Sequence, residues 1–343
     1  MHKGLNLAPT NKSVGNFVLT NVPYILNQNL QKISMTHFGI ICPAATGHLN
    51  PMTTLGYELQ KRGHQVTVIG ILDAQPKAIS AGLGFRAIGE SKFQPGWTAQ
   101  RDLQQGKLSG LAALKYTLGW LKDLAVIFFQ EAPSVIKQER IEALLVDQAS
   151  PEGGTIADFL DIPFVSICSA LVLNKDVNIP PFFSNWQYSP FFWARLRNQA
   201  IYNLLDYIGE PIRNVITEYR WEWKLPKHYN YNENYSQLAQ ISQQPPEFEF
   251  PRQNLPDCFH FTGPFSNPAS REATFFPFEK LTGQPLIYTS MGTLQNGLSE
   301  VFQKIASACK ALDAQLVISL GNSTNLESLP KLPGNPLVVR YAP

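Results

Sequence analysis

The amino-acid sequence predicts an α/β protein built from two units of parallel β-sheet. From His37 onward, short β-branched runs alternate with segments whose apolar residues recur at helical spacing, which is typical of strand–helix–strand units. The same pattern starts again near Pro285, after a segment that lacks it. The length of 343 residues agrees with two domains of roughly 150 residues each.

Composition narrows the class of protein. The net charge is only +2, from 28 basic and 26 acidic residues, which argues against a dedicated nucleic-acid binder. No stretch approaches the roughly 18 apolar residues of a membrane-spanning helix. Hydrophobic residues make up 44% and charged residues 16%, enough for a large core and for apolar surface that could take an apolar ligand.

Cysteine usage predicts a reducing compartment. The four cysteines are far apart and form no CxxC pair, so we expect neither a disulfide framework nor a zinc site. We therefore expect reduced thiols in a cytoplasmic protein. The cysteines are Cys42, Cys168, Cys258 and Cys309.

Residues 1–34 differ from the rest of the chain. They contain six asparagines and no acidic residue, and Asn21 and Pro23 interrupt their apolar stretch too much for a signal-peptide core. Met35 immediately precedes the first strand candidate. We expect 1–34 to be a disordered or artefactual extension outside the fold.

The first strand–helix–strand unit begins with the apolar run HFGIIC, followed by the loop PAATGHLNP. Asn50 is a plausible N-cap, with Pro51 at the first helical position. The helix is expected to stop at Gly63, before the β-branched run QVTVIGIL. This unit implies a parallel sheet with a right-handed crossover.

The same pattern, which predicts a doubly wound parallel sheet for the N-terminal part of the chain, continues to about Cys168. IEALLVD and IPFVSIC are predicted to be buried strands, with the helical segment GGTIADFLD between them. Aromatic residues crowd 180–223, where one helix is expected from Phe192 to about Trp221, and YSQLAQIS is a further strand candidate. We assign 35–256 to an N-terminal domain and 257–284 to an interdomain linker.

The range 285–343 contains PLIYTSMG, an amphipathic helix, QLVISLG and PLVVRYA. One apolar stripe of the helix runs from Val301 to Leu312. About 60 residues and three strands are too few for a closed α/β layer. We therefore expect 285–343 to be an incomplete second Rossmann-like domain.

Two residues at the carboxyl edge of the first sheet could carry acid–base chemistry. His48 follows the first strand close to a helix N-terminus, which disfavours a positive charge and so favours a neutral imidazole that accepts a proton. Asp147 ends its strand at the same edge and could orient that ring and stabilise the imidazolium. The alternatives are a histidine that only packs or caps, and an aspartate that only caps the following backbone.

The loop Thr289–Thr293 has small residues whose backbone N–H groups suit a phosphate, although an ordinary strand-to-helix turn has the same pattern. Neither GxGxxG nor GxxxxGK[ST] occurs, which argues against a nicotinamide-dependent enzyme and against a P-loop.

The aromatic residues of 182–207 could line a pocket, contact a membrane surface or belong to the core. They lie too close together to face one way, so we expect some of them to be exposed to a ligand or partner. Arg195 and Arg197 lie among them, which adds peripheral membrane contact through 182–208 as a hypothesis.

Together these motifs resemble a known family. The run HFGIICPAATGHLNPMTTLGYELQKRGHQVTVI resembles the opening of the UDP-glycosyltransferases of the GT-B fold, in the branch similar to bacterial macrolide glycosyltransferases. The resemblance continues, in the same order and spacing, through LLVDQASPEGGTIADFLDIPFVSI, FTGPF, PLIYTSMGT and VVRYAP. It spans about Thr36 to Pro343.

The resemblance implies an inverting transfer of a sugar from a UDP-sugar to a hydroxyl of a small apolar acceptor, of terpenoid, carotenoid, sterol, phenolic or macrolide type. His48 corresponds to the general base of the family and Asp147 to its partner. No metal, no cofactor beyond the donor substrate and no obligate protein partner are expected. The resemblance places donor-phosphate contacts at Ser290, Gly292 and Thr293, and we assign acceptor contacts to Gly47, Trp186, Phe191 and Phe192.

One departure from the family leaves an alternative open. The sequence ends at Pro343, before the family's donor-recognition motif, so we expect 1–343 alone to bind nucleotide sugar poorly and to turn over slowly or not at all. The alternative is a non-catalytic protein that binds apolar ligands and derives from such an enzyme. The presence of both His48 and Asp147 favours the enzyme, since a binding protein needs no base.

Overall fold

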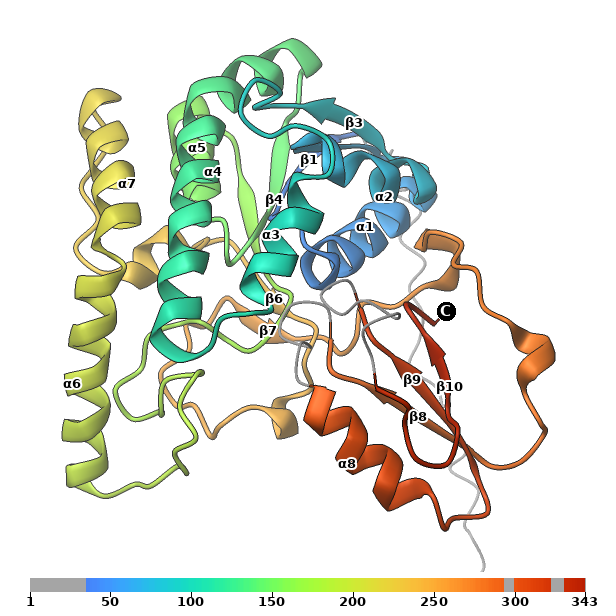
Figure 1. The fold of residues 1–343 in the computed structure, drawn as a ribbon. Coiled ribbons are helices and arrows are strands. Elements are labelled where there is room, and N and C mark those ends of the chain that lie inside the picture. The colour runs from blue at the N-terminus through green and yellow to red at the C-terminus, as the bar shows by residue number, and fades with distance from the viewer. Residues whose placement is uncertain (1–34, 293–298, 322–329, 343) are drawn as a thin grey trace, which may run out of the picture. The chain divides into compact units, whose positions relative to one another are not determined.

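The computed structural model describes residues 35–292, 299–321 and 330–342, which form two parallel β-sheets (Figure 1). The expected extension 1–34 and Thr293 lie outside the described residues. The larger sheet has seven strands in the order β3-β2-β1-β4-β5-β6-β7. These strands are β1 His37–Ile41, β2 Gln65–Gly70, β3 Gly84–Ala87, β4 Ala143–Asp147, β5 Phe164–Cys168, β6 Gln240–Ser242 and β7 Phe259–Phe261.

The strand order of this sheet reverses its direction between β1 and β4. Ile41 of β1 pairs with Ile69 of β2 on one side and with Val146 of β4 on the other, and all three strands are parallel. The chain proceeds outward from β1 in one direction and from β4 in the other. Their junction is therefore a topological switch point, the place where open α/β sheets leave a crevice at the carboxyl ends of their strands.

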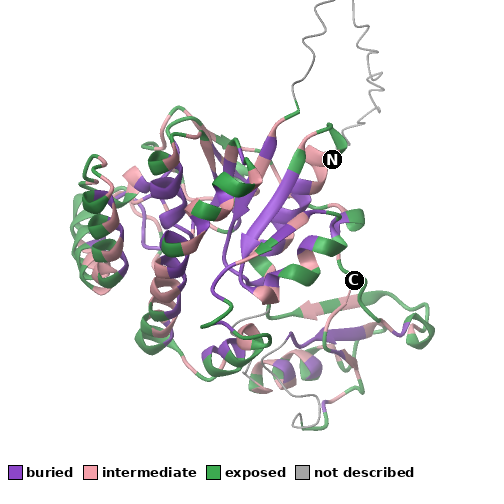
Figure 2. Cartoon of the chain, turned by 90° about the horizontal axis from the view of Figure 1, so that it is seen from above, coloured by how far each residue is buried: buried purple, intermediate pink, exposed green. Residues whose placement is uncertain are grey.

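Helices cover both faces of the larger sheet, which confirms the predicted doubly wound arrangement. Figure 1 shows α1 and α2 on one face and α4 and α5 on the other. The strands between them are mostly buried, as Figure 2 shows. These helices, with α3, have the bounds α1 Thr46–Lys61, α2 Gln75–Ser80, α3 Trp97–Gln105, α4 Gly110–Glu139 and α5 Glu152–Leu160.

The first helix starts earlier than its sequence predicts. The backbone N–H groups of His48 and Leu49 both donate to the carbonyl of Ala45, at 2.9 and 2.8 Å, so α1 begins at Thr46. Asn50 is therefore not the N-cap, and Pro51 lies within the helix, where it removes one backbone donor. His48 is consequently a residue of the first helical turn, not of a loop. The expected stop at Gly63 is confirmed, with φ of 88° directly after the C-cap.

The single helix expected from Phe192 to about Trp221 is two helices, α6 Phe192–Ile208 and α7 Glu210–Glu222. They meet at Gly209, and Pro211 follows in the first turn of α7, where its missing N–H costs little. Much of the surface of both helices is exposed, as the pair at the left of Figure 2 shows.

The larger sheet also extends past the expected domain boundary at 256. β7 lies inside the range 257–284 that the sequence assigns to the linker, and its His260 pairs with Ile241 of β6. The backbone N–H of Thr262 continues this pairing by donating to the carbonyl of Ser242 at 2.9 Å. Three residues of strand are too short to give a clear period-two pattern, which is why the sequence does not indicate them.

The smaller sheet contains the three parallel strands predicted for the second unit, in the order β10-β9-β8. Phe302 and Ala306 of its helix are buried, in one cluster with Leu316 and Ile318. Leu312, expected in the apolar stripe, lies after the helix and is exposed. The bounds are β8 Leu286–Ser290, α8 Ser299–Cys309, β9 Gln315–Ser319 and β10 Leu337–Val339.

Among the described segments no helix is long and apolar enough to cross a membrane. Short 3-10 turns join several of the helices and strands. The turns are η1 Leu72–Ala74, η2 Tyr231–Asn234, η3 Pro246–Phe248, η4 Pro268–Ser270 and η5 Phe278–Lys280.

Close packing of α5 on β4 yields a stability prediction. A Cβ added at Gly153 would lie 2.5 Å from Cγ1 of Val146, whose β-branched side chain has little freedom to move. Gly153→Ala is therefore expected to lower the free energy of unfolding by about 1–3 kcal/mol, as overpacked cores do. Denaturant unfolding measures this change.

Gly119→Ala in α4 is the matched control, because Gly119 has open space around its Cβ position. It should raise stability by roughly 0.5–1 kcal/mol through helix propensity alone. Equal gains in both variants would contradict the packing of α5 against β4.

Candidate active site

The switch point between β1 and β4 brings His48 and Asp147 together. β4 ends at Asp147, while only a short loop, 42–45, separates the end of β1 from α1. The first turn of α1 therefore lies over the same sheet edge, and Nδ1 of His48 is 3.0 Å from Oδ2 of Asp147. The pairing that the sequence suggests is thus present as a hydrogen bond.

The Asp147 carboxylate is completely buried and is held by several donors. The backbone N–H of Ala149 donates to Oδ1 at 2.8 Å, and the Ser169 hydroxyl donates to Oδ2 at 2.6 Å. These bonds offset the cost of removing the charge from water. Sequence reasoning missed Ser169, because only the β4–β5 register, in which Asp147 pairs with Ile167, brings the residue after β5 close to Asp147.

His48 keeps one ring nitrogen available. Its side chain is 24% exposed, and the tautomer in which Nδ1–H donates to the Asp147 carboxylate leaves the lone pair on Nε2. Among the described residues no hydrogen bond engages Nε2. His37 is different, because its two ring nitrogens contact the carbonyl of Glu139 and the hydroxyl of Thr67, both at 2.8 Å. That ring is therefore a structural one.

Opposing effects set the basicity of His48. Burial, the largest effect, lowers the pKa of the imidazole, but the charge and hydrogen bond of Asp147 raise it and prevail, so the net shift is upward. Arg101 adds a smaller lowering effect. The sequence analysis names two opposing influences, a helix N-terminus that disfavours the imidazolium and an Asp147 that stabilises it, and the net direction follows Asp147.

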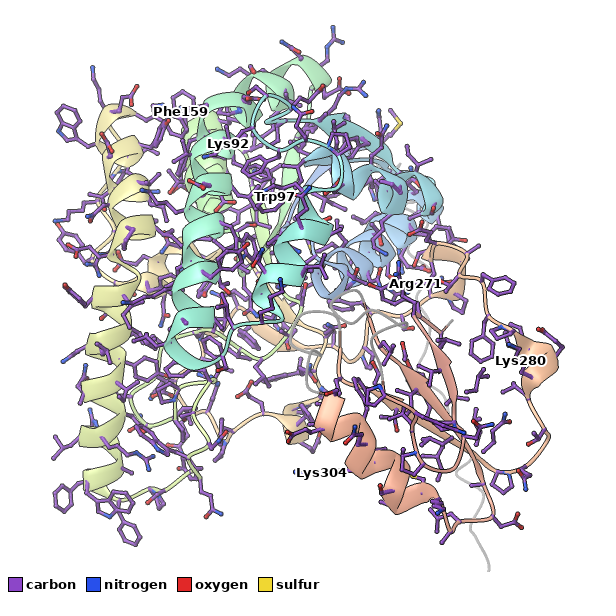
Figure 3. The ribbon with its side chains drawn as sticks, in the orientation of Figure 1. Lys92, Trp97, Phe159, Arg271, Lys280 and Lys304 are labelled. Carbon is purple, nitrogen blue, oxygen red and sulfur yellow. The ribbon has the colours of Figure 1, made fainter. Side chains whose placement is uncertain are left out.

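Arg101 is a second residue that sequence reasoning did not single out. It is 2% exposed, pairs with Asp102 at 2.7 Å and donates to the carbonyl of Ala44, in the loop before α1, at 3.3 Å. Its guanidinium lies 4.6 Å from the ring centroid of Trp120 and 5.3 Å from that of Trp97, which Figure 3 labels on α3. This buried cation therefore supports the loop that leads to His48.

The candidate donor loop follows β8. Ser290 is the last residue of the strand, and the N–H of Gly292 donates to its hydroxyl at 3.2 Å. Gly292 has φ of 76°, a conformation that suits glycine. Of the three residues assigned to donor phosphates, Ser290 and Gly292 thus lie at the carboxyl edge of their sheet, and Thr293 lies outside the described residues.

The residues assigned to the acceptor lie at two places. Gly47 precedes His48 in the first turn of α1, and no atom would lie within 4 Å of an added Cβ there. Phe191 and Phe192 are 64% and 77% exposed at the start of α6. Trp186 is half-buried, and the Arg197 guanidinium lies 4.2 Å from its ring centroid. The described structure contains no ring contact between these three aromatic residues and His48.

This arrangement suits proton abstraction from a hydroxyl group. A neutral Nε2 can take the proton, and the Asp147 carboxylate stabilises the imidazolium that forms. Among the described residues, no group of three or more His, Cys, Asp or Glu side chains could hold a metal ion.

Comparison with known proteins finds glycosyltransferases of similar sequence. The chain is 30% identical over 288 residues to a zeaxanthin glucosyltransferase of Pantoea ananas and 31% identical over 286 residues to one of Pseudescherichia vulneris. The aligned regions cover 83% of this chain in both cases, and 66% and 67% of the relatives. The chain thus spans about two thirds of the length of these curated relatives.

A solved glycosyltransferase structure has a similar fold. The kitacinnamycin glycosyltransferase has a TM-score of 0.64 at 19% identity, covering 90% of this chain and 72% of that one. A scan of protein-family models finds no match. The identity to the two zeaxanthin glucosyltransferases and the shared fold place this chain in the UDP-glycosyltransferase family with the GT-B fold.

Proposed function

We propose that the protein transfers a sugar, with inversion, from a UDP-sugar to a hydroxyl of a small apolar acceptor. The observation that carries this proposal is the 3.0 Å hydrogen bond between His48 and the buried Asp147 at the switch point of the larger sheet. In this proposal His48 is the general base and Asp147 orients it.

The proposed step is a single displacement. The acceptor hydroxyl gives its proton to Nε2 of His48 while its oxygen attacks the anomeric carbon of the sugar. The bond from that carbon to the phosphate oxygen breaks, and UDP leaves with the electron pair. Attack opposite the leaving group inverts the configuration. The loop with Ser290 and Gly292 is proposed to contact the departing diphosphate, whose charge must be stabilised.

We infer a carotenoid-type acceptor among the apolar classes that the sequence leaves open. The two relatives at 30% and 31% identity are named zeaxanthin glucosyltransferases. We place Gly47 beside the reacting hydroxyl and the aromatic residues Trp186, Phe191 and Phe192 along the apolar part of the acceptor.

We also propose that the protein works in the cytoplasm, with the start of α6 resting on an anionic lipid surface. Phe191, Phe192 and Leu196 are each more than 60% exposed. Arg195 and Arg197 lie among them, and no acidic residue occurs from Val177 to Leu205. Exposed aromatics with basic residues are typical of segments that bind membrane interfaces, where an apolar acceptor would also reside.

Replacing the base separates catalysis from binding. His48→Ala is expected to reduce the rate of transfer from UDP-glucose about 10²–10⁴-fold, because general-base catalysis contributes that much. Acceptor affinity, followed by quenching of tryptophan fluorescence with a dihydroxy carotenoid, should change less than twofold. His260→Ala, at an exposed histidine, is the control. A full transfer rate in His48→Ala would exclude the proposed base.

The pH dependence of transfer follows from the raised pKa of His48. Because the base must be neutral, the rate should fall as the pH drops through a pKa above the ordinary value of 6.5. Asp147→Asn removes the charge that raises this pKa, so the acidic limb should move to lower pH while the plateau rate falls. A limb that moves to higher pH in Asp147→Asn, measured from kcat/KM profiles, would contradict the assignment.

Lipid binding is tested by flotation with vesicles that contain phosphatidylglycerol. The double variant Phe191→Ser/Phe192→Ser should lose most of the lipid-bound fraction, whereas Phe275→Ser, at another exposed phenylalanine, should not. Wild-type protein that stays entirely in the lipid-free fraction would rule out this surface.

A further inference from the structure

We propose that Ser169 is a positioning residue that fixes the Asp147 carboxylate and lowers the basicity of the His48–Asp147 pair. The inference rests on the proposed role of His48 as the general base. It concerns a residue outside the expected site, at the end of a different strand.

The geometry ties one carboxylate oxygen to two donors. Oδ2 of Asp147 accepts the Ser169 hydroxyl at 2.6 Å and Nδ1 of His48 at 3.0 Å, while Oδ1 accepts the N–H of Ala149 at 2.8 Å. Rotation of the carboxylate would lengthen all three bonds. Ser169 thus holds Oδ2 in the direction from which it meets the imidazole.

Ser169 is itself held in place. It is 6% exposed, directly follows the last residue of β5, and its carbonyl accepts a hydrogen bond from the side chain of Gln243. Gln243 directly follows β6, the strand paired with β5. Two neighbouring strands therefore determine where the hydroxyl lies.

The direction of the electrostatic effect follows from the hydrogen bond. An ionised carboxylate can only accept, so the single proton of the Ser169 hydroxyl points to Oδ2. A donor to an anion stabilises its charge and makes it less basic. The carboxylate then attracts the imidazolium less strongly, which keeps more of His48 neutral and ready to accept a proton.

The other titratable groups around the pair leave Asp147 as its main negative charge. Burial raises the pKa of Glu152 to about 8 and that of Cys168 to about 12. It also raises the pKa of a second thiol and of two tyrosine hydroxyls, so these groups are mostly neutral at pH 7. Arg101 supplies the opposing positive charge. The neutral groups are Glu152, Cys42, Cys168, Tyr231 and Tyr235.

The test is a titration of the six histidines, labelled with ¹³C, by NMR, with His48→Gln assigning the signal. Ser169→Ala should raise the pKa of His48 by roughly half a unit or more, because the carboxylate loses a stabilising donor. Ser169→Thr keeps the hydroxyl and should return the pKa to its wild-type value. A pKa that stays constant or falls in Ser169→Ala would overturn the proposal.

Ser166→Ala is the matched control. Ser166 lies on β5, the strand that Ser169 follows, and is also buried, but its hydroxyl accepts from the N–H of Ser236 and not from the His48–Asp147 pair. The pKa of His48 should not change in this variant. A rise as large as that in Ser169→Ala would mean that loss of any buried hydroxyl has this effect, which would contradict the positioning role of Ser169. If Ser169→Ala does not fold, the isosteric Ser169→Cys, a weaker donor, must shift the pKa upward for the proposal to stand.

The same experiment separates this inference from the proposed function, since the pKa is measured without substrate. A raised pKa in Ser169→Ala together with no transfer by the wild-type protein would refute only the proposed function. Loss of transfer in His48→Ala with an unchanged pKa in Ser169→Ala would refute only the positioning role.

Discussion

The parallel pairing of β1 with β4 is the constraint on which the site depends. It joins strands that are about a hundred residues apart in sequence and directs both of their carboxyl ends to one edge of the sheet. The first turn of α1 then places His48 at that edge, where it contacts Asp147, the last residue of β4. Neither residue could function in the proposed way without the other, because an isolated buried carboxylate is costly and an isolated imidazole has no fixed tautomer.

Burial of a single carboxylate organises the surrounding chemistry. Asp147 is fully buried, and its charge is tolerated because backbone, hydroxyl and imidazole donors surround it. Glu152 nearby also has hydrogen bonds from the backbone and from Ser150, but burial outweighs them and raises its pKa to about 8. The site therefore combines one buried carboxylate, held by several hydrogen-bond donors, with neighbouring acids whose pKa values are raised by burial.

Arg101 shows how a structural residue can also affect the site. Its ion pair with Asp102 and its contacts with Trp97 and Trp120 are the kind of packing that stabilises a core. The same position, however, brings a positive charge close enough to oppose the effect of Asp147 on His48. The basicity of His48 thus depends on two buried charges of opposite sign, which are carried by different elements of the fold.

The sequence by itself determined the fold class, the parallel strands of both units and the two residues of the pair, because these depend on local periodicity and on strand ends. It could not give the start of α1, the break at Gly209 or the short strand β7, where backbone hydrogen bonding and register outweigh local pattern. Only the tertiary structure decided that Ser169 contacts Asp147 and that Arg101 donates to Ala44 in the loop before α1. The physical reason is that both contacts join residues far apart in the chain, so their distances follow from sheet register and helix packing, which no local stretch of sequence encodes.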